Sequence, residues 1–395
     1  MGKMMSWATD RVRRSPRLPG TYVNRVSDLE DRLTPLTATV IVWFPTAPDS
    51  LYQIRPWFHA LEQLHRVHPV LVVCRDSRVS AHVRAASSLN ALSLGTSAEL
   101  DELLAISPDV RIALYVNLDP LDFDCLRFRS MLHVYIGHGD SDKRVFASNQ
   151  VKAFDHYFVA GSAAIDRLEA ELMFYDARGH AVVIGQPQLD GAAVQWEAPV
   201  TGPGSRIVYA PTWEGAHPSM SYTSVSSHGE AIVSSLLRAG HEIVYRPHPF
   251  TGRHDPTAAD ADRRIRAMVM AAGHHVDETP DLRASFGSAA ALITDVSAVV
   301  SYWMPSGRPV LVTVPDGTDA APGTLATRLP RLRVADAAAA ADHVADLLRN
   351  PPNVTDDIAT HLGDVTPGAA TTAFVEAVSA AISRRNAAWD AKKPA

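Results

Sequence analysis

Short apolar runs rich in valine and isoleucine recur along this chain of 395 residues, and most of them are followed by a stretch with helical spacing of its apolar residues. Runs of this length are typical of buried strands. We predict strands at residues 39–44, 70–74, 91–94, 112–116, 133–136, 154–159, 181–185, 206–210, 242–246, 290–294 and 309–314. We predict helices at residues 57–64, 79–84, 99–106, 163–172 with Ser162 as cap, 230–239, 263–272, 298–304, 335–349 and 369–385. The alternation predicts an α/β fold with mostly parallel sheets that helices cover on both faces.

The alternation is interrupted between Gly191 and Ser205, where glycines and prolines occur without apolar spacing. This composition is typical of a linker. We therefore divide the chain into a basic tail (1–36), a first α/β domain (37–192), a linker (193–205), a second α/β domain (206–365) and a C-terminal helix and tail (366–395). We expect a ligand site in the cleft between the domains, at the carboxyl ends of the strands.

Composition excludes several classes of protein. The net charge of −6 argues against a nucleic-acid-binding protein. Cys74 and Cys125 are far apart and predict neither a disulfide framework nor a cysteine zinc site. No apolar run is long enough to span a membrane, and the N-terminus lacks the apolar segment of a secretory signal, so we expect a cytoplasmic protein. The tail at 1–36 has a net charge of +3 and either contacts an anionic membrane surface or, as we favour, is a solvated extension.

A histidine between two glycines follows the predicted strand at 133–136. The sequence over residues 136–143 is Ile-Gly-His-Gly-Asp-Ser-Asp-Lys. The glycines give close access to the imidazole of His138, which can accept a proton beside an anionic substrate. Taken alone, the motif is better explained as a polar turn with an incidental histidine.

A second motif, Tyr-Arg-Pro-His-Pro over residues 245–249, ends another predicted strand. Prolines stiffen the backbone that carries Arg246 and His248. The guanidinium is a planar donor suited to phosphate oxygens, and the imidazole can donate a further hydrogen bond. The alternative is a surface loop with a cis-proline.

The third motif is Thr-Asp-Val-Ser over residues 294–297, at the end of a buried strand and the start of a helix. Free amides and hydroxyls at a helix start bind anions, although the same residues also serve as simple helix caps. The sequence has no phosphate-binding Walker loop and no dinucleotide-binding glycine motif, so NAD is not expected. The three motifs together favour a phosphorylated ligand held by the second domain and presented to His138.

The order of five motifs resembles the CDP-glycerol glycerophosphotransferase family, which includes teichoic acid primases and polymerases. The motifs are His-Gly with Lys at 138–143, Tyr-Ala-Pro-Thr-Trp at 209–213, Arg-Pro-His-Pro at 246–249, Ile-Thr-Asp-Val-Ser at 293–297 and Arg-Pro-Val-Leu-Val at 308–312. The resemblance covers roughly residues 40–385. It implies a GT-B-like fold, in which two Rossmann-like parallel-sheet domains, one for the acceptor and one for the nucleotide donor, face each other across a cleft.

The resemblance also implies an activity: transfer of glycerol phosphate or a related polyol phosphate from a CDP-activated donor to a hydroxyl of a lipid-linked or glycan acceptor, with release of CMP. It implies that His138 is the base and that His248 is the second catalytic residue. The implied substrate contacts are Gly139, Asp140, Lys143, Thr212, Arg246, Thr294, Asp295 and Ser297. No cofactor is expected, and no metal is needed if these donors neutralise the leaving group.

This chain departs from the family pattern at two motifs. Asp-Ser-Asp replaces the usual Thr-Pro-Leu over residues 140–142, where we expect acceptor contacts, and Val-Ser-Ala replaces Tyr-Ser-Ser over residues 296–298. Two alternatives remain open. The pocket could hold a UDP-sugar in a GT-B glycosyltransferase or epimerase, or the protein could be a non-catalytic nucleotide-binding scaffold. The other histidines that we considered have no zinc-site spacing, and we predict them on the surface: His59, His65, His68, His274 and His275.

Overall fold

Two parallel sheets form the frame of the molecule in a computed structural model that describes residues 37–139, 148–191, 196–215, 221–279, 281–315 and 325–392. The first sheet has the order β3-β2-β1-β4-β5-β6-β7 and the second the order β10-β9-β8-β11-β12-β13, with every pair parallel. The first comprises β1 (Val40–Phe44), β2 (Val70–Cys74), β3 (Asn90–Ser93), β4 (Ile112–Tyr115), β5 (Leu132–Tyr135), β6 (His156–Val159) and β7 (Ala181–Val183). The second comprises β8 (Arg206–Ala210), β9 (Glu242–Tyr245), β10 (His275–Val276), β11 (Ala291–Thr294), β12 (Val310–Val314) and β13 (Arg331–Arg333).

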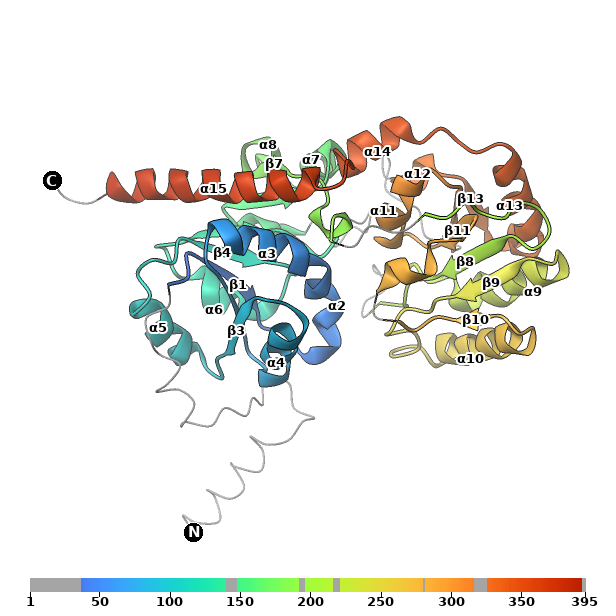
Figure 1. Cartoon of the computed structure of the whole chain (residues 1–395), viewed down its shortest axis with the longest axis horizontal. Helices are drawn as coiled ribbons and strands as arrows, with labels where there is room; N and C mark the ends of the chain where they lie inside the picture. The colour runs from blue at the N-terminus through green and yellow to red at the C-terminus, as the bar shows by residue number, and fades with distance from the viewer. Residues whose placement is uncertain are drawn as a thin grey trace, which may run out of the picture.

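Helices cover both faces of each sheet, so the predicted α/β fold with two parallel-sheet domains is confirmed (Figure 1). The helices of the first domain are α2 (Leu51–Ile54), α3 (Phe58–Val67), α4 (Ser77–Ala86), α5 (Ser97–Ala105), α6 (Phe123–Leu126), α7 (Ser162–Glu171) and α8 (Ala177–His180). Those that follow are α9 (Glu230–Arg238), α10 (Pro256–Ala271), α11 (Val299–Trp303), α12 (Leu325–Arg328), α13 (Ala340–Arg349), α14 (Thr355–Leu362) and α15 (Ala369–Asp390).

The sequence signals for the strands were strong wherever a strand is fully buried. β2 and β8 have the predicted bounds, and the other predicted strands differ by only one or two residues at an end. The sequence did not predict β10 and β13, because these short edge strands contain exposed or charged residues in place of an apolar run. Prediction of the cap of α7 was wrong: Gly161 occupies the N-cap, and Ser162 is the first residue of the helix.

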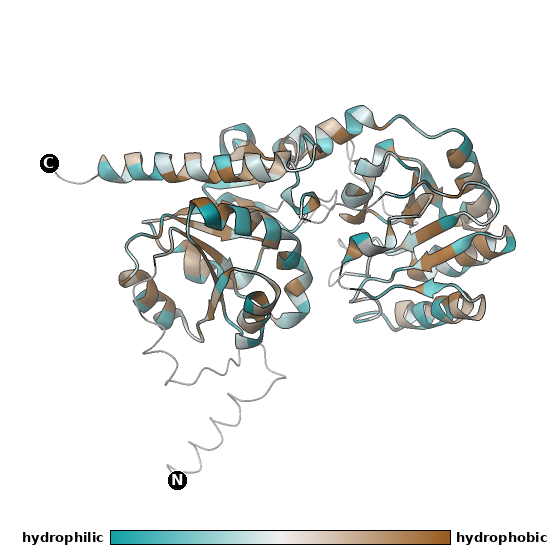
Figure 2. Ribbon diagram, viewed as in Figure 1, coloured by the Kyte–Doolittle hydropathy of each residue, from teal (hydrophilic) through white to brown (hydrophobic). Residues whose placement is uncertain are grey.

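Alternating side chains of each strand enter different cores. In β1, Val40, Val42 and Phe44 pack on one face with α3 and α4, whereas Ile41 and Trp43 pack on the other face with α5 and α7. All five residues of β1 are buried because both faces are covered. Figure 2 shows the result as apolar strands between helices that turn their polar sides outward.

The long helix α15 belongs to the first domain in space, although it comes last in the described chain. It follows α14 of the second half and lies along the first domain against α3 and β5 (Figure 1). Phe374 of α15 is fully buried, and its ring lies 5.2 Å from the ring of Trp57. The helix N-terminus is held by Asp190, whose carboxylate accepts hydrogen bonds from the amides of Gly368 (2.9 Å) and Thr371 (2.7 Å).

We expect Phe374→Ala to lower the free energy of unfolding by about 3 to 5 kcal/mol, because it leaves a cavity in the first core. Chemical denaturation followed by circular dichroism measures the change. Phe123→Ala is the matched control, since that ring is 63% exposed, and should change stability by less than about 1 kcal/mol. Equal losses in the two variants would contradict the assignment of α15 to the first core.

Candidate active site

The site lies where the strand order of each sheet reverses. In the first sheet the chain runs outward from β1 in one direction and from β4 in the other, and in the second sheet from β8 and β11. Loops that follow such a central pair turn to opposite faces and leave a crevice at the carboxyl ends of the strands. The loops after β1, β4 and β5 carry Tyr52, Val116 and His138. Those after β8, β9 and β11 carry the second-domain motifs.

His138 is held in one tautomer by the backbone of the first domain. Its Nδ1 lies 3.2 Å from the carbonyl oxygen of Val116, and a carbonyl can only accept, so Nδ1 donates. In the neutral ring this makes Nε2 the proton-accepting nitrogen. Gly137 (φ 65°) and Gly139 (φ 141°) adopt backbone conformations that favour glycine, and the carbonyl of Gly137 is fixed by the indole N–H of Trp57 at 2.6 Å.

The half-buried His248 of the second domain is held in the opposite tautomer to His138. Its Nδ1 accepts the backbone N–H of Phe250 at 3.1 Å, so in the neutral ring Nε2 carries the proton and can donate. The imidazole stacks on Trp213, with ring centroids 5.9 Å apart and planes at 17°.

Glu214 fixes the loop that carries His248. The Glu214 side chain is buried, and its carboxylate accepts the amides of Gly252 (2.9 Å) and His254 (2.7 Å). The structure therefore offers a basic nitrogen from one domain and an N–H donor from the other.

Tyr52 of α2 contacts both histidines with its ring. The sequence motifs did not predict it as a site residue. Its ring meets His138 edge-on at 6.3 Å and His248 edge-on at 5.7 Å between centroids. Its hydroxyl accepts from the amide of Gln53 (3.3 Å), which in turn accepts from the amide of Asn117 after β4 (3.1 Å). Burial raises the pKa of Tyr52, so the phenol stays protonated. The signal that could have found Tyr52 is its place in the loop after the first central strand.

Arg246 is held by its own domain. Its guanidinium donates to the carboxylate of Asp277 at 2.7 Å and to the carbonyl of Thr279 at 2.6 Å. Burial alone would raise the pKa of Asp277, but hydrogen bonds from Ser285 and Thr279 and the charge of Arg246 outweigh it and lower the pKa. The Arg246 charge is therefore already paired, and its contact with a phosphate stays a prediction.

The side chains of Thr294 and Asp295 turn into the second domain. Both are fully buried, and the Thr294 hydroxyl donates to the carbonyl of Ala210 at 2.6 Å. The Asp295 carboxylate accepts the amides of Thr212 (2.7 Å) and Ser224 (3.2 Å) and the hydroxyl of Thr313. Burial raises the pKa of Asp295 to about 6, although these hydrogen bonds lower it. These side chains thus fix the loops after β8 and β11.

The two domains approach each other closely beside His138. A Cβ atom placed on Gly139 would lie 3.2 Å from the Cβ atom of Ala298. Ala298 follows Ser297, which is half-buried and whose hydroxyl accepts the amide of Val299 at 3.4 Å. The helix that begins there, α11, has five residues and ends in a tighter turn, so it is shorter than predicted.

The predicted site residues thus fall into three groups. His138 and His248 come together on Tyr52, and Gly139 approaches Ala298, the residue after Ser297. Thr212, Arg246, Thr294 and Asp295 instead form hydrogen bonds within the second domain. Asp140 and Lys143 lie outside the described residues, as does the basic tail.

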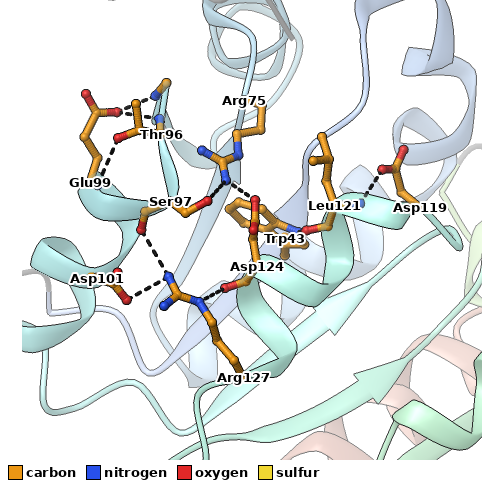
Figure 3. A network of polar contacts seen from close by, with 11 residues as sticks. Trp43, Arg75, Thr96, Ser97, Glu99, Asp101, Asp119, Leu121, Asp124 and Arg127 are labelled. Carbon is orange, nitrogen blue, oxygen red and sulfur yellow. Dashed lines mark hydrogen bonds and ion pairs between the residues drawn. The ribbon is translucent and has the colours of Figure 1, made fainter. Parts of the chain in front are cut away.

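A polar network closes the other half of the carboxyl edge of the first sheet (Figure 3). Arg75 after β2 forms an ion pair with Asp124 of α6, donates to the hydroxyl of Ser97 at 3.0 Å and lies over the ring of Trp43 at 5.3 Å. Arg127 pairs with Asp101 at 2.8 Å and donates to the carbonyl of Ser97. The charges on this side of the edge are therefore paired among themselves.

The described ranges contain no cluster of three or more histidine, cysteine, aspartate or glutamate residues that could hold a metal ion. No helix in this part of the chain has the length and apolar character needed to cross a membrane.

Residues 138–322 match the family of CDP-Glycerol:Poly(glycerophosphate) glycerophosphotransferases. The resemblance to this family is confirmed. The match begins at His138 and includes the loops that carry His248 and Ser297. A search of curated proteins gave no significant match.

Solved structures with the same fold come from two groups of enzymes. The wall teichoic acid polymerase TagF has a TM-score of 0.55 and 12% identity, with 89% of this chain and 90% of that chain covered. The UDP-GlcNAc 2-epimerase from Neisseria meningitidis bound to UDP-GlcNAc has a TM-score of 0.57 and 13% identity, covering 86% and 99%. The S. aureus MnaA-UDP co-structure has a TM-score of 0.52 and 13% identity, covering 86% and 96%. At these identities the similarity establishes the GT-B-like fold.

We expect the stability of the protein to fall, relative to an Asp295→Asn variant, as the pH rises from 4 to 6. The folded-state pKa of about 6 lies above the unfolded value of 3.8, so the folded state binds more protons in this window. The difference between pH 4 and pH 6 amounts to about 2 kcal/mol. Urea denaturation of both proteins across this pH range measures it, and parallel pH profiles for the two would contradict the burial of an ionisable carboxyl at this position.

Proposed function

We propose that this protein transfers glycerol phosphate, or a related polyol phosphate, from a CDP-activated donor to a hydroxyl of a lipid-linked or glycan acceptor and releases CMP. The product would be a teichoic acid or another cell-surface polymer. The observation that carries the proposal is the pairing of His138, with Nε2 as its basic nitrogen, and His248, with Nε2 as its donor, on either side of Tyr52 within the part of the chain that matches the family.

In the proposed reaction, Nε2 of His138 takes the proton from the acceptor hydroxyl as its oxygen attacks the β-phosphorus of the donor. The bond between that phosphorus and the bridging oxygen breaks, and the bridging oxygen leaves with CMP. A positioned base of this kind contributes roughly 10²- to 10⁴-fold to the rate. The Nδ1–H bond to Val116 stabilises the imidazolium that forms.

His248 has the geometry to stabilise the charge on the diphosphate. Its Nε2–H group donates from a ring that Trp213 and the Phe250 amide hold in place, so no reorganisation is needed during the reaction. Ser297 and the amides after Asp295 contribute further donors in this proposal, with Arg246, Gly139, Asp140 and Lys143 completing the substrate contacts. The buried hydrogen bonds of Asp295 support the proposal because they keep the backbone after β11 in a fixed position.

The family match supports the choice of donor, as does a structure of TagF with CDPG, which has a TM-score of 0.55 and 13% identity to this chain. A lipid-linked acceptor would bring the cytoplasmic protein to the inner face of the cell membrane. The second candidate function is that of a UDP-sugar enzyme, favoured by the equally similar fold of the epimerase bound to UDP-GlcNAc.

A donor panel distinguishes the two functions. We expect CDP-glycerol or CDP-ribitol to raise the melting temperature of the protein, because the binding energy adds to the stability of the folded state, and UDP-sugars to leave it unchanged. Differential scanning fluorimetry measures the shift. Stabilisation by UDP-GlcNAc alone would favour the epimerase or glycosyltransferase, and donor binding without CMP release would favour a non-catalytic scaffold.

We expect His138→Ala to reduce the rate of CMP release from CDP-glycerol, with acceptor present, by roughly 10²- to 10⁴-fold, since the base is lost. The thermal shift by CDP-glycerol should persist, because the second domain holds the donor. His343→Ala on α13 is the matched control and should release CMP at the wild-type rate. Wild-type CMP release from His138→Ala would show that the base lies elsewhere.

A further inference from the structure

A cavity lies beside His138 at the carboxyl ends of β5, β6 and β7. It is partly open to solvent, and Gly137 and Gly139 on either side of the histidine line it. Two glutamines in the loop after β7, Gln186 and Gln188, also line it. Neither glutamine belongs to the five motifs described above, although both lie within the range that matches the family.

Both glutamine side chains are buried without satisfying their hydrogen-bonding groups. Gln186 is 2% exposed, and within the described chain neither its amide nitrogen nor its amide oxygen has a partner. Gln188 is 3% exposed, and its amide oxygen also has no partner there. Buried polar groups are nearly always hydrogen-bonded, so two such side chains on one cavity wall indicate a missing partner.

The loop that carries the glutamines is held firmly from three sides. Gly185 adopts a φ of 73°, and a Cβ atom there would lie 2.8 Å from the Cβ atom of Ala370 in α15. Asp190 binds the start of the same helix, and the carbonyl of Gln188 accepts from Arg283 of the second domain at 3.3 Å. The glutamines therefore cannot easily turn outward to reach solvent, and the cavity is preorganised.

The chemistry of the cavity wall selects a neutral ligand that carries several hydroxyls. None of the described residues that line it is charged, so a phosphate would find no counter-charge there. An amide side chain offers two donors and an acceptor, which match hydroxyl groups because each hydroxyl both donates and accepts. Trp57 and Tyr157 add apolar walls suited to the C–H face of a sugar or polyol.

We propose that this cavity is the acceptor subsite, and that Gln186 and Gln188 bind a neutral polyhydroxylated unit, a sugar ring or a polyol, next to the hydroxyl that His138 deprotonates. The inference rests on the proposed function for the identity of the reaction. It adds the class of acceptor unit and the residues that select it. The acceptor would enter from the side of β5 to β7, with its charged or lipid portion outside the cavity.

The test uses the full-length protein and a Gln186→Met variant, which keeps the side-chain length and removes the polar atoms. Saturation-transfer NMR with glycerol, ribitol and methyl β-N-acetylglucosaminide measures binding of neutral probes. We expect signal from at least one probe in the wild type and its loss in Gln186→Met. The matched control is Gln150→Met, an exposed position outside the cavity, which should retain the signal. No probe signal in the wild type, or an unchanged signal in Gln186→Met, would overturn the proposal and leave ordered water as the occupant.

Thermal denaturation of the same proteins gives a second readout. Replacing a buried unsatisfied amide by an apolar side chain of similar shape is neutral or stabilising, so we expect the melting temperature of Gln186→Met to equal or exceed that of the wild type. A clear decrease would mean that Gln186 serves the fold and would overturn the proposal. CDP-glycerol should stabilise both proteins equally. CDP-glycerol could fail to stabilise both the wild type and Gln186→Met while binding of a neutral probe is still lost in Gln186→Met. In that case the proposed donor is wrong, and the proposal of a subsite at Gln186 stands.

Discussion

In each parallel sheet the chain starts in the middle and adds strands outward, first to one side and then to the other. The central pairs, β1 with β4 and β8 with β11, are therefore the places where neighbouring loops turn away from each other. In the first domain this opening places Tyr52 and the carbonyl of Val116 around His138. In the second, the Asp295 carboxylate joins the loops at the opening. The strand order thus sets where the site loops lie, and individual side chains then fix the geometry within them.

Two kinds of buried polar group lie on either side of this site. The Asp295 carboxylate accepts hydrogen bonds from three groups of its own domain, so it stabilises a fixed arrangement of loops. The amide of Gln186 has no partner within the described residues. A buried polar group with its hydrogen bonds made stabilises the fold. A buried polar group without partners lowers stability, and such groups are typical of functional sites. The Asp295 carboxylate therefore supports the loops of the second domain, whereas the amide of Gln186 is the group that the proposed acceptor subsite uses.

Much of the architecture could be predicted from the sequence, because a strand buried on both faces needs a continuous apolar run. β2 and β8 are examples, and β13, with two exposed arginines, shows where the signal fails. The predicted site was less complete. Residue type could not tell that Asp295 faces inward, because the same carboxylate can accept from a ligand or from its own backbone. Tyr52 and Gln186 could not be found without strand order and burial, since neither stands in a recognisable motif.

Helix α15 has a consequence for how the chain is assembled. The first core includes Phe374, Val378 and Ala381, which are synthesised after the whole second domain. During translation the surface of the first domain that α15 covers therefore stays exposed until the second domain has been synthesised. This differs from the usual order, in which N-terminal domains fold first. The chain also crosses between the domains twice, so any opening of the cleft has to bend both crossings together. One crossing comes before Trp196, whose ring already packs on Phe286 and Trp303 of the second domain. The other contains Gly363 and Gly368, which have φ values of 70° and 84°.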